Sequence, residues 1–355
     1  MQRLKILLLT SIPYGPYRAD AKLGDGPDRH AAARALARLG IEMRTISPYG
    51  FPWNPLAGRH PLFQSLDPIR SLQALVAGRH YDLVIAGNDG PAVLLVLLRR
   101  LFRLKTPILI WDFSPAESWR LRAWLQDITV PKVAGVLALP SLQESYIREK
   151  WGRHLQVVAI GQLVDTDFYC PQPARLEGYV LSVGDDGGRD YQTLLTAAAG
   201  LDIDLTIKTS QPLAPSNDSR ARIRQVSERL SYADLRTLYA GSAFVVVPLT
   251  AHPHNASGVN AVQEASAMGK ALIVSDSDGV RDFVRPGETC LAVPAGDPPA
   301  LAAAIRRLQD EPDTRRRLGD NARRFAEEQF APDAFARRFA AAARRFIPGG
   351  DDQST

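Results

Sequence analysis

Short runs of apolar residues recur along the chain, and each is followed by a polar loop and a stretch with helical spacing. In the first half, five such runs predict buried strands at 4–10, 41–46, 81–86, 107–111 and 135–139. In the second half, five more predict strands at 179–183, 203–207, 244–247, 271–275 and 290–293. Strands that alternate with helices form parallel sheets that are covered on both faces. The pattern therefore predicts an α/β protein.

Helical spacing and prolines together predict how the chain is divided. Alanine-rich or amphipathic stretches predict helices at 30–39, 189–200, 299–308, 315–330 and 332–346. The segment GQLVDTDFYCPQP, 161–173, has two prolines and no apolar period, so we place a linker there. A chain of 355 residues exceeds what one core usually supports, which favours two domains. We expect domains at 1–163 and 164–345, a last helix able to pack back on the first domain, and a disordered tail at 346–355.

The composition is that of an ordinary globular protein, with 45% hydrophobic and 23% charged residues. Cys170 and Cys290 are too few for a disulfide framework and lack the spacing of metal ligands. The first apolar run is too short for a signal peptide, and AVLLVLL at 92–98 is too short to cross a bilayer. We expect a cytoplasmic protein.

Charge is distributed unevenly between the two halves. Residues 1–165 hold 21 Lys and Arg against 13 Asp and Glu, whereas the remainder holds 22 against 25. A basic first half suggests an anionic partner, and no nucleic-acid-binding motif is present. RRLFRLK (99–105) and WRLRAW (119–124) interleave arginines with bulky apolar residues. Two interpretations remain open: contact with an anionic membrane or a lipid-linked acceptor, or amphipathic helices whose apolar faces are core.

The stretch SVGDDGGRDYQTLL, 182–195, is the first candidate for chemistry. A strand ends, glycines allow a tight turn, and a helix begins, which is an arrangement that favours phosphate. Arg189 adds donors that match phosphate oxygens, whereas Asp185 and Asp186 would repel an anion. The alternative is an ordinary strand–helix turn with a surface arginine.

The second candidate is HNASGVNAVQEASAMGK, 254–270. Asn255 or Ser257 can cap the helix, and Gly258 lets a ligand approach the backbone, so that N–H groups near 258–261 would face an anion. Glu264, two turns further on, can accept hydrogen bonds from a vicinal diol such as ribose; alternatively it meets solvent or a salt bridge. Lys208, after the strand at 203–207, is a further candidate cation.

The order of these features carries a resemblance. The segments VGDDGGRDYQTLL, SYADLRTLYAGSAFVVVPL, SGVNAVQEASAMGKALIVSDSDGVRDFV and GETCLAVPAGDPPALAAAI follow one another through 179–330. In this order and spacing they resemble the nucleotide-sugar domain of retaining glycosyltransferases of family 4. GDGPDRH in the first half is similar to the family's glycine loop. The resemblance implies the GT-B fold, in which two doubly wound Rossmann-like domains face a central cleft.

The resemblance also implies roles for single residues. Glu264 matches the second glutamate of the family's glutamate pair, which holds the donor ribose, and Arg189 matches the basic residue that neutralises the leaving diphosphate. Val226 and Ser227 fall where the family cradles the base. The residues that we expect to bind the donor are Gly184, Lys208, Val226, Ser257, Gly258, Val259, Asn260 and Ala261.

This chain departs from the family pattern at three positions. Ala256 stands where the first glutamate of the pair is expected, and Asp185 stands where a second basic residue is expected. The strand at 107–111 leads into Trp111-Asp112-Phe113, without the family's histidine. Asp112 is therefore the candidate for orienting the donor sugar, and the catalytic candidates are Arg189, Glu264 and Asp112.

These features predict transfer of a sugar from a nucleotide-diphosphate-sugar donor to an acceptor, with retention at the anomeric carbon. Positive charge from the protein can stabilise the departing diphosphate, so we expect no metal and no cofactor. The expected partners are a nucleotide sugar, a sugar or lipid-linked acceptor, and the inner membrane surface through the basic first half. One alternative is an inactive GT-B binding or scaffold protein, which Ala256 and Asp185 favour. The other is a nucleotide-sugar epimerase, for which His252 and His254 are the only paired histidines.

Overall fold

The computed structural model describes residues 3–9, 26–28, 31–46, 68–113, 115, 120–173, 178–251 and 257–347. The chain divides into two units, each built around its own sheet. The first unit runs from β1 (Leu4–Leu9) to Gln162 and takes up the chain again at Phe335. The second unit holds Leu163–Ala334 together with a short segment that includes residues 26–28.

The sheet of the first unit has six parallel strands in the order β2-β1-β3-β4-β5-β6. After β1, these strands are β2 Ile41–Ile46, β3 Leu83–Ala86, β4 Ile108–Trp111, β5 Gly135–Ala138 and β6 Gln156–Ala159. The inner strands β3 and β5 are buried on both faces, as expected where helices cover both sides of a parallel sheet.

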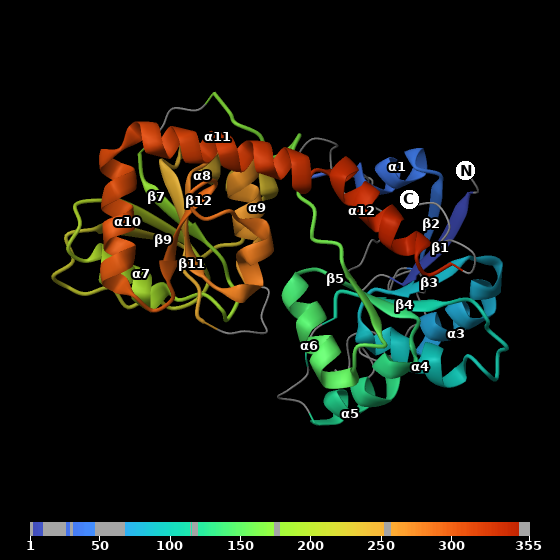
Figure 1. Cartoon of the computed structure of the whole chain (residues 1–355). Helices are drawn as coiled ribbons and strands as arrows, with labels where there is room; N and C mark the ends of the chain where they lie inside the picture. The colour runs from blue at the N-terminus through green and yellow to red at the C-terminus, as the bar shows by residue number, and fades with distance from the viewer. Residues whose placement is uncertain are drawn as a thin grey trace. The chain divides into compact units, whose positions relative to one another are not determined.

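Helices cover the first sheet on both faces (Figure 1). They are α1 Ala31–Arg38, α3 Pro68–Ala77, α4 Asp89–Leu98, α5 Arg120–Thr129, α6 Ser141–Trp151 and α12 Pro332–Arg344, with short 3₁₀ turns at Gly78–His80 and Val130–Lys132. Figure 1 shows α3 to α6 on one face, and α1 and α12 on the other. Phe335 of α12 stacks on Trp111 at a ring distance of 6.0 Å, and Phe339 lies 5.4 Å from the same ring. The last helix therefore completes the core of the first unit.

The second sheet also has six parallel strands, in the order β12-β11-β10-β7-β8-β9. They are β7 Val180–Val183, β8 Asp204–Lys208, β9 Arg222–Val226, β10 Phe244–Val247, β11 Leu272–Asp276 and β12 Cys290–Pro294. The chain builds outward from β7 through β8 and β9, and then returns to the other side of β7 with β10. The order of strands thus reverses between β7 and β10.

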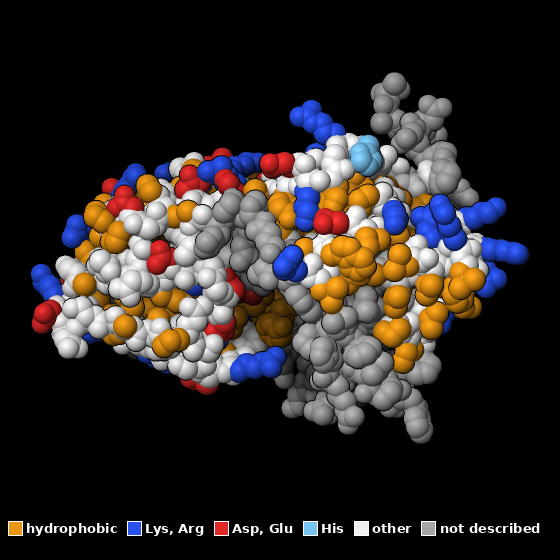
Figure 2. All heavy atoms as spheres, turned by 90° about the horizontal axis from the view of Figure 1, so that it is seen from below, with side chains coloured by type: hydrophobic (Ala, Val, Ile, Leu, Met, Phe, Trp, Pro, Cys, Tyr) orange, Lys and Arg blue, Asp and Glu red, His pale blue; other side chains and the backbone are white. Residues whose placement is uncertain are grey.

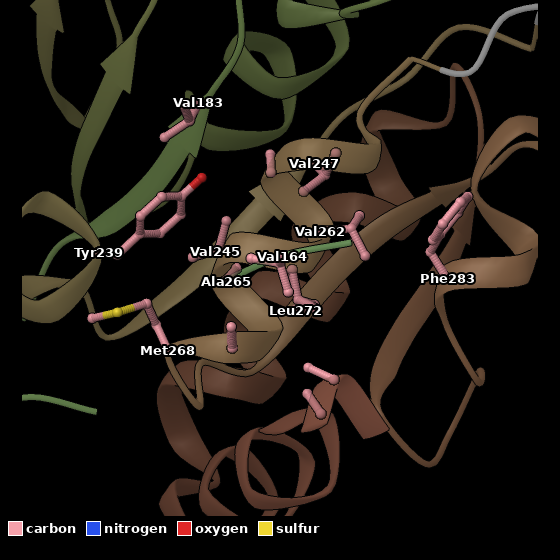
Figure 3. Packing of buried hydrophobic residues seen from close by; sticks show 14 of the residues in the cluster. Val164, Val183, Tyr239, Val245, Val247, Val262, Ala265, Met268, Leu272 and Phe283 are labelled. Atoms are coloured by element: carbon pink, nitrogen blue, oxygen red, sulfur yellow. The ribbon is translucent and has the colours of Figure 1, made fainter. Parts of the chain in front are cut away.

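Two apolar layers enclose the second sheet. The helices of this unit are α7 Tyr191–Ala198, α8 Tyr232–Gly241, α9 Val259–Ala267, α10 Pro298–Asp310 and α11 Pro312–Gln329, with a 3₁₀ turn at Asp278–Phe283. One layer packs α7 and α10 against the sheet, and the other packs α8, α9 and α11. Figure 3 shows Tyr239 of α8 in the second layer, near Val183, Val245 and Met268.

The prediction of two doubly wound α/β domains is confirmed, and ten of the predicted strands are present to within two residues at either end. Strands β6 and β9 were not predicted. Both lie at sheet edges, and β9 reads Arg-Ile-Arg-Gln-Val with mostly exposed side chains, so it lacks the apolar run of a buried strand. Residues 99–103 form a turn after α4, whereas Arg120–Thr129 is helical. In the parts of the chain that the model describes, no helix is both long and apolar enough to cross a membrane.

Candidate functional site

The loops that follow β7 and β10 meet in the second unit at the point where the strand order reverses. Two backbone hydrogen bonds join the loops: Thr250 N donates to Gly188 O at 3.0 Å, and Asp190 N donates to Pro248 O at 3.1 Å. Arg189 and Leu249 also pair as a single antiparallel β-bridge. In doubly wound sheets, ligands bind beyond the carboxyl ends of the strands at such a reversal. This location makes the two loops the first place to look for a ligand site.

Arg189 lies at the centre of this junction with only 3% of its side chain exposed. Its Nε donates to Asp186 Oδ2 at 3.0 Å, while no described residue accepts a hydrogen bond from its buried Nη1. The guanidinium packs on Gly184, where φ is 158° and an added Cβ would collide with it. A buried cationic donor without an acceptor is costly, so Nη1 is suited to an anionic ligand.

Lys208, at the end of β8, is held by Asp185. The Nζ donates to Asp185 Oδ2 at 2.8 Å, and the backbone N–H of Ser210 donates to the other carboxylate oxygen. Burial opposes ionisation of this carboxyl, but the hydrogen bonds from Lys208 and Ser210 prevail and lower the pKa of Asp185 to about 2. The sequence-predicted cation is therefore at the site, with its charge balanced by a neighbouring aspartate.

Asp186 joins the β7 loop to the start of α9. The Ser257 hydroxyl donates to Asp186 Oδ1, as does the backbone N–H of Gly188 at 3.1 Å. Burial again opposes ionisation, but the Ser257 hydrogen bond and the Arg189 charge lower the pKa of Asp186 below its usual value. The sequence suggested only that Asp186 would repel an anion. In the structure, Asp186 also holds Ser257, Gly188 and Arg189 in place.

Helix α9 begins at Gly258, not at the side-chain cap that was predicted. Gly258 is the N-cap residue with φ at 84°, and no side chain caps the helix, because the Ser257 hydroxyl is bonded to Asp186. The other predicted cap, Asn255, lies outside the described residues. The first N–H groups of a helix, here at Val259, Asn260 and Ala261, have no acceptor within the helix, and they carry partial positive charge.

Glu264, two turns into α9, is partly buried beside two tyrosines. Tyr239 Oη donates to Glu264 Oε2 at 2.9 Å. The Tyr169 hydroxyl also lies beside this carboxyl, although it does not reach regular hydrogen-bond geometry with any described acceptor. Burial raises the pKa of Glu264 to about 7, and the tyrosine hydroxyls and the Arg189 charge limit the rise. The carboxyl therefore titrates near neutrality, with Oε1 left for a further donor.

Val226 lies at the far side of the same sheet edge. It pairs with Lys208 in the register of β8 and β9, and its carbonyl accepts from Thr209 N at 3.1 Å. Its side chain is buried, and the following Ser227 is exposed. A base at this position would therefore meet the backbone here and Ser227.

Asp112 belongs to the first unit, at the carboxyl end of β4. Its φ of 57° is a left-handed conformation that few residues other than glycine adopt. Desolvation raises the pKa of its carboxyl, and the charge of Asp89 raises it further, although the residue is exposed overall. Asp89 itself is fully engaged, since Arg122 donates to both of its oxygens at 3.0 and 2.7 Å.

The second unit thus gathers most of the predicted site residues. The residues that lie around the point where the strand order reverses are Gly184, Arg189, Lys208, Ser257, Gly258, Val259, Asn260, Ala261 and Glu264. Val226 lies beside Lys208. The sequence reasoning missed the roles of Tyr169 and Tyr239 and the bonds of Asp185 and Asp186. The tyrosines had no recognisable pattern, because Tyr239 is 25 residues from Glu264 along the chain.

Three Asp-x-Asp triplets occur in the sequence, at 165–167, 202–204 and 276–278. Asp165 accepts the N–H groups of Asp167 and Phe168. The other two triplets form ion pairs with arginines, Asp202 and Asp204 with Arg222, and Asp276 and Asp278 with Arg281. Within the described ranges, no group of three or more His, Cys, Asp or Glu is placed to hold a metal ion. Ala256, His252 and His254 lie outside those ranges.

Comparison with known proteins is consistent with this geometry. The family model of glycosyl transferases group 1 matches residues 193–311. The chain is 28% identical over 244 residues to the MMP alpha-(1->4)-mannosyltransferase of Mycolicibacterium hassiacum, which covers 62% of this chain and 58% of that protein. The match thus spans less than two thirds of that relative's length.

Solved structures resemble the chain over nearly its whole length. Sucrose-phosphate synthase from Thermosynechococcus elongatus has a TM-score of 0.73 at 20% identity, covering 97% of this chain and 99% of its own. HepE from Anabaena in complex with UDP-glucose has a TM-score of 0.65 at 15% identity, covering 95% and 98%. The fold is therefore that of the GT-B glycosyltransferases, as predicted.

Proposed function

We propose that the protein is a retaining glycosyltransferase similar to family 4, which moves a sugar from a nucleotide-diphosphate-sugar donor to a sugar or lipid-linked acceptor. The observation that carries the proposal is the buried Arg189, which lies where the strand order reverses, beside the loop that follows β10. No described residue accepts a hydrogen bond from its Nη1. The match to glycosyl transferases group 1, which covers the neighbouring residues 193–311, supports it. The UDP-glucose complex of HepE supports a nucleotide sugar as the donor.

In this proposal the diphosphate lies between Arg189 and the N-terminus of α9. Negative charge grows on the diphosphate as the bond to the sugar breaks, and fixed donors stabilise it most when they are aimed there beforehand. Arg189 is held by Gly184 and Asp186, so its donors need little reorganisation. Lys208 contributes once the diphosphate competes with Asp185 for its Nζ.

The ribose is held by Glu264. One carboxylate oxygen accepts from Tyr239, and the other is available for the hydroxyls of the diol. This role requires the ionised carboxylate, and the raised pKa of about 7 makes donor binding sensitive to pH near neutrality. The base is proposed to lie toward Val226 and Ser227, and Asp112 is proposed to orient the donor sugar. No metal or cofactor is required in this scheme.

The test is a release assay for nucleoside diphosphate against a panel of nucleotide sugars, together with calorimetric titration of UDP and GDP. We expect turnover with one donor, and a loss of at least a hundredfold in Arg189→Ala and Glu264→Ala. Arg222→Ala is the matched control, because Arg222 lies at the opposite, amino edge of the same sheet. It should keep the activity of the wild type.

The outcomes separate the alternatives. Nucleotide binding without turnover on any donor and acceptor would favour the inactive scaffold protein. The ion pairs of Arg189 with Asp186 and of Lys208 with Asp185 are compatible with that alternative. No binding at millimolar nucleotide would refute the proposed site altogether. Conversion of a free nucleotide sugar to its epimer would favour the epimerase.

A further inference from the structure

Helices α3, α4 and α5 lie side by side over one face of the first sheet, and their outer surface is unusually apolar. Six large apolar side chains are exposed there: Leu72 and Val76 on α3, Leu97 and Leu101 at the end of α4, and Leu121 and Trp124 on α5. Leu101 is 76% exposed and Trp124 is 57% exposed. Among the described residues, Tyr232 is the only other large apolar side chain with such exposure. We refer to these six residues as the apolar face.

The apolar face is separate from the side chains that these helices bury against the sheet. Each helix already buries its other side, as with Leu75 on α3, Leu95 on α4 and Gln126 on α5. Leu72 and Val76 on α3 are four residues apart and Leu121 and Trp124 on α5 are three apart, so each pair points the same way on its helix. Leu101 follows α4 in the turn at 99–103. Apolar side chains exposed together in this way mark an interaction surface.

Exposed basic residues lie at the ends of these helices and in the turns that follow them. They are the exposed side chains of Arg79, Arg100, Arg103, Lys105, Arg120 and Lys132, and Figure 2 shows Lys and Arg side chains bordering the apolar ones on this unit. Within the described part of the chain, no carboxylate forms a salt bridge with any of the six. The nearby acids are occupied: Asp89 binds Arg122, and Asp127 accepts from Lys150 and Trp151. The surface is therefore apolar at its centre and positive at its border.

We infer that the apolar face docks on an anionic lipid bilayer. Leucine and tryptophan side chains insert at the level of the headgroups, while arginine and lysine reach back to the phosphates from the border. A protein partner of the same shape would need an acidic rim around an apolar pocket, whereas an anionic bilayer offers both chemistries everywhere on its surface. The inference goes beyond the proposed transferase activity and does not depend on it.

Flotation of the full chain with vesicles tests this inference. Vesicles of phosphatidylcholine with 30% phosphatidylglycerol should bind the protein, and pure phosphatidylcholine should bind it at least tenfold less. Each basic residue near an anionic surface raises affinity by about fivefold, so binding should also weaken steeply with added salt. Leu101→Ser with Trp124→Ser should reduce binding at least tenfold, as should Arg100→Glu with Lys105→Glu.

The control variant changes the same amount of charge on the second unit. Arg306→Glu with Arg324→Glu replaces two exposed arginines on α10 and α11, and it should bind anionic vesicles like the wild type. All variants alter exposed residues, so nucleotide binding and thermal melting should stay unchanged and exclude misfolding. The inference is overturned if the wild type stays unbound at low salt, if the control loses as much binding as the test variants, or if the apolar face instead mediates self-association.

Discussion

At the residue scale, the environment of Glu264 opposes the ionised form that the proposed function needs. Burial raises its pKa to about 7, above the ordinary value of 4.5. The folded protein therefore keeps the proton between pH 4.5 and 7, where the unfolded chain releases it. This contribution to stability is complete at low pH and is lost as the pH rises through 7. Stability and the proposed ribose binding are thus in conflict at this carboxyl.

We predict that Glu264→Gln makes the protein more stable and a weaker nucleotide binder. A glutamine has no charge to desolvate and can still accept from Tyr239, so unfolding at pH 8 should cost about 2 kcal/mol more. A charge-assisted hydrogen bond is lost, so UDP or GDP affinity should fall at least tenfold. Wild-type affinity should rise from pH 6 to pH 8, and that of the variant should stay flat in calorimetric titration. A wild-type profile without this rise would contradict the role given to Glu264.

Glu264 is proposed to favour nucleotide binding, whereas Asp185 opposes it. The Asp185 carboxylate pairs with Lys208 and competes with any bound phosphate for its Nζ. We predict that Asp185→Asn raises affinity for a nucleoside diphosphate by about fivefold, since a partly exposed ion pair is worth about 1 kcal/mol. Asp204→Asn is the control, because Asp204 forms a similar ion pair with Arg222 at the amino edge of the sheet. Equal or weaker binding by Asp185→Asn, measured by the same titration, would exclude this gating role.

The predicted site residues that the structure brings together share one property: they lie next to a strand end or a helix start in the sequence. Arg189, Lys208 and Gly258 are of this kind, so local patterns locate them. Their partners are set by tertiary structure. Asp186 meets Ser257 across 71 residues, and Tyr239 meets Glu264 across 25, which no local pattern reports.

At the scale of elements, the start of α9 depends on one backbone conformation. Gly258 has a φ of 84°, and an added Cβ would lie 2.9 Å from Leu249 Cδ2 and 3.1 Å from Val247 Cγ1. Leu249 belongs to the loop that bridges to Arg189, so a displaced α9 start disturbs both halves of the proposed phosphate site.

We predict that Gly258→Ala lowers the free energy of unfolding by about 2–3 kcal/mol and nucleotide affinity at least tenfold. Strain from the left-handed conformation accounts for about 1 kcal/mol, and the close contacts account for the rest. Gly296→Ala is the matched control, with a φ of 70° and nothing within 4 Å of its added Cβ. It should lose about 1 kcal/mol in urea unfolding and keep its affinity. Equal losses of stability and nucleotide affinity in both variants would contradict the role given to the contacts of Gly258 with Leu249 and Val247.

The inner strands were all predicted, whereas of the four edge strands only β2 and β12 were. The inner strands of both sheets are continuous apolar runs and were predicted, because only a fully covered strand has that pattern. The edge strand β9 is largely solvated and its sequence carries no comparable run, whereas the short apolar run of β6 was overlooked.

At the scale of the whole molecule, the first unit is discontinuous in sequence. Its sheet is complete by β6, but α12 joins it only after the entire second unit. Phe335, Phe339 and Phe346 are buried, and Arg338 donates to Ile160 O at 2.9 Å. The last helix is therefore part of the first core, although it follows the second domain in sequence.

We predict that Phe339→Ala destabilises the first unit alone, by about 3–5 kcal/mol, as is usual for a fully buried phenylalanine. Hydrogen exchange should become faster in β4 and β5, and stay unchanged in β7 and β10. UDP or GDP affinity should remain within twofold of the wild type, because the proposed donor site lies in the second unit. Arg337→Ala on the exposed side of the same helix is the control, and faster exchange in β7 would contradict the independence of the units.

The late position of α12 sets an order of events during synthesis. The ribosome finishes the second unit before it has made the three phenylalanines that close the first core. The earlier-synthesised unit must therefore wait, with the aromatic ring of Trp111 uncovered on one face, until α12 emerges. Of the two units, the one whose synthesis begins first is the last that can complete its fold.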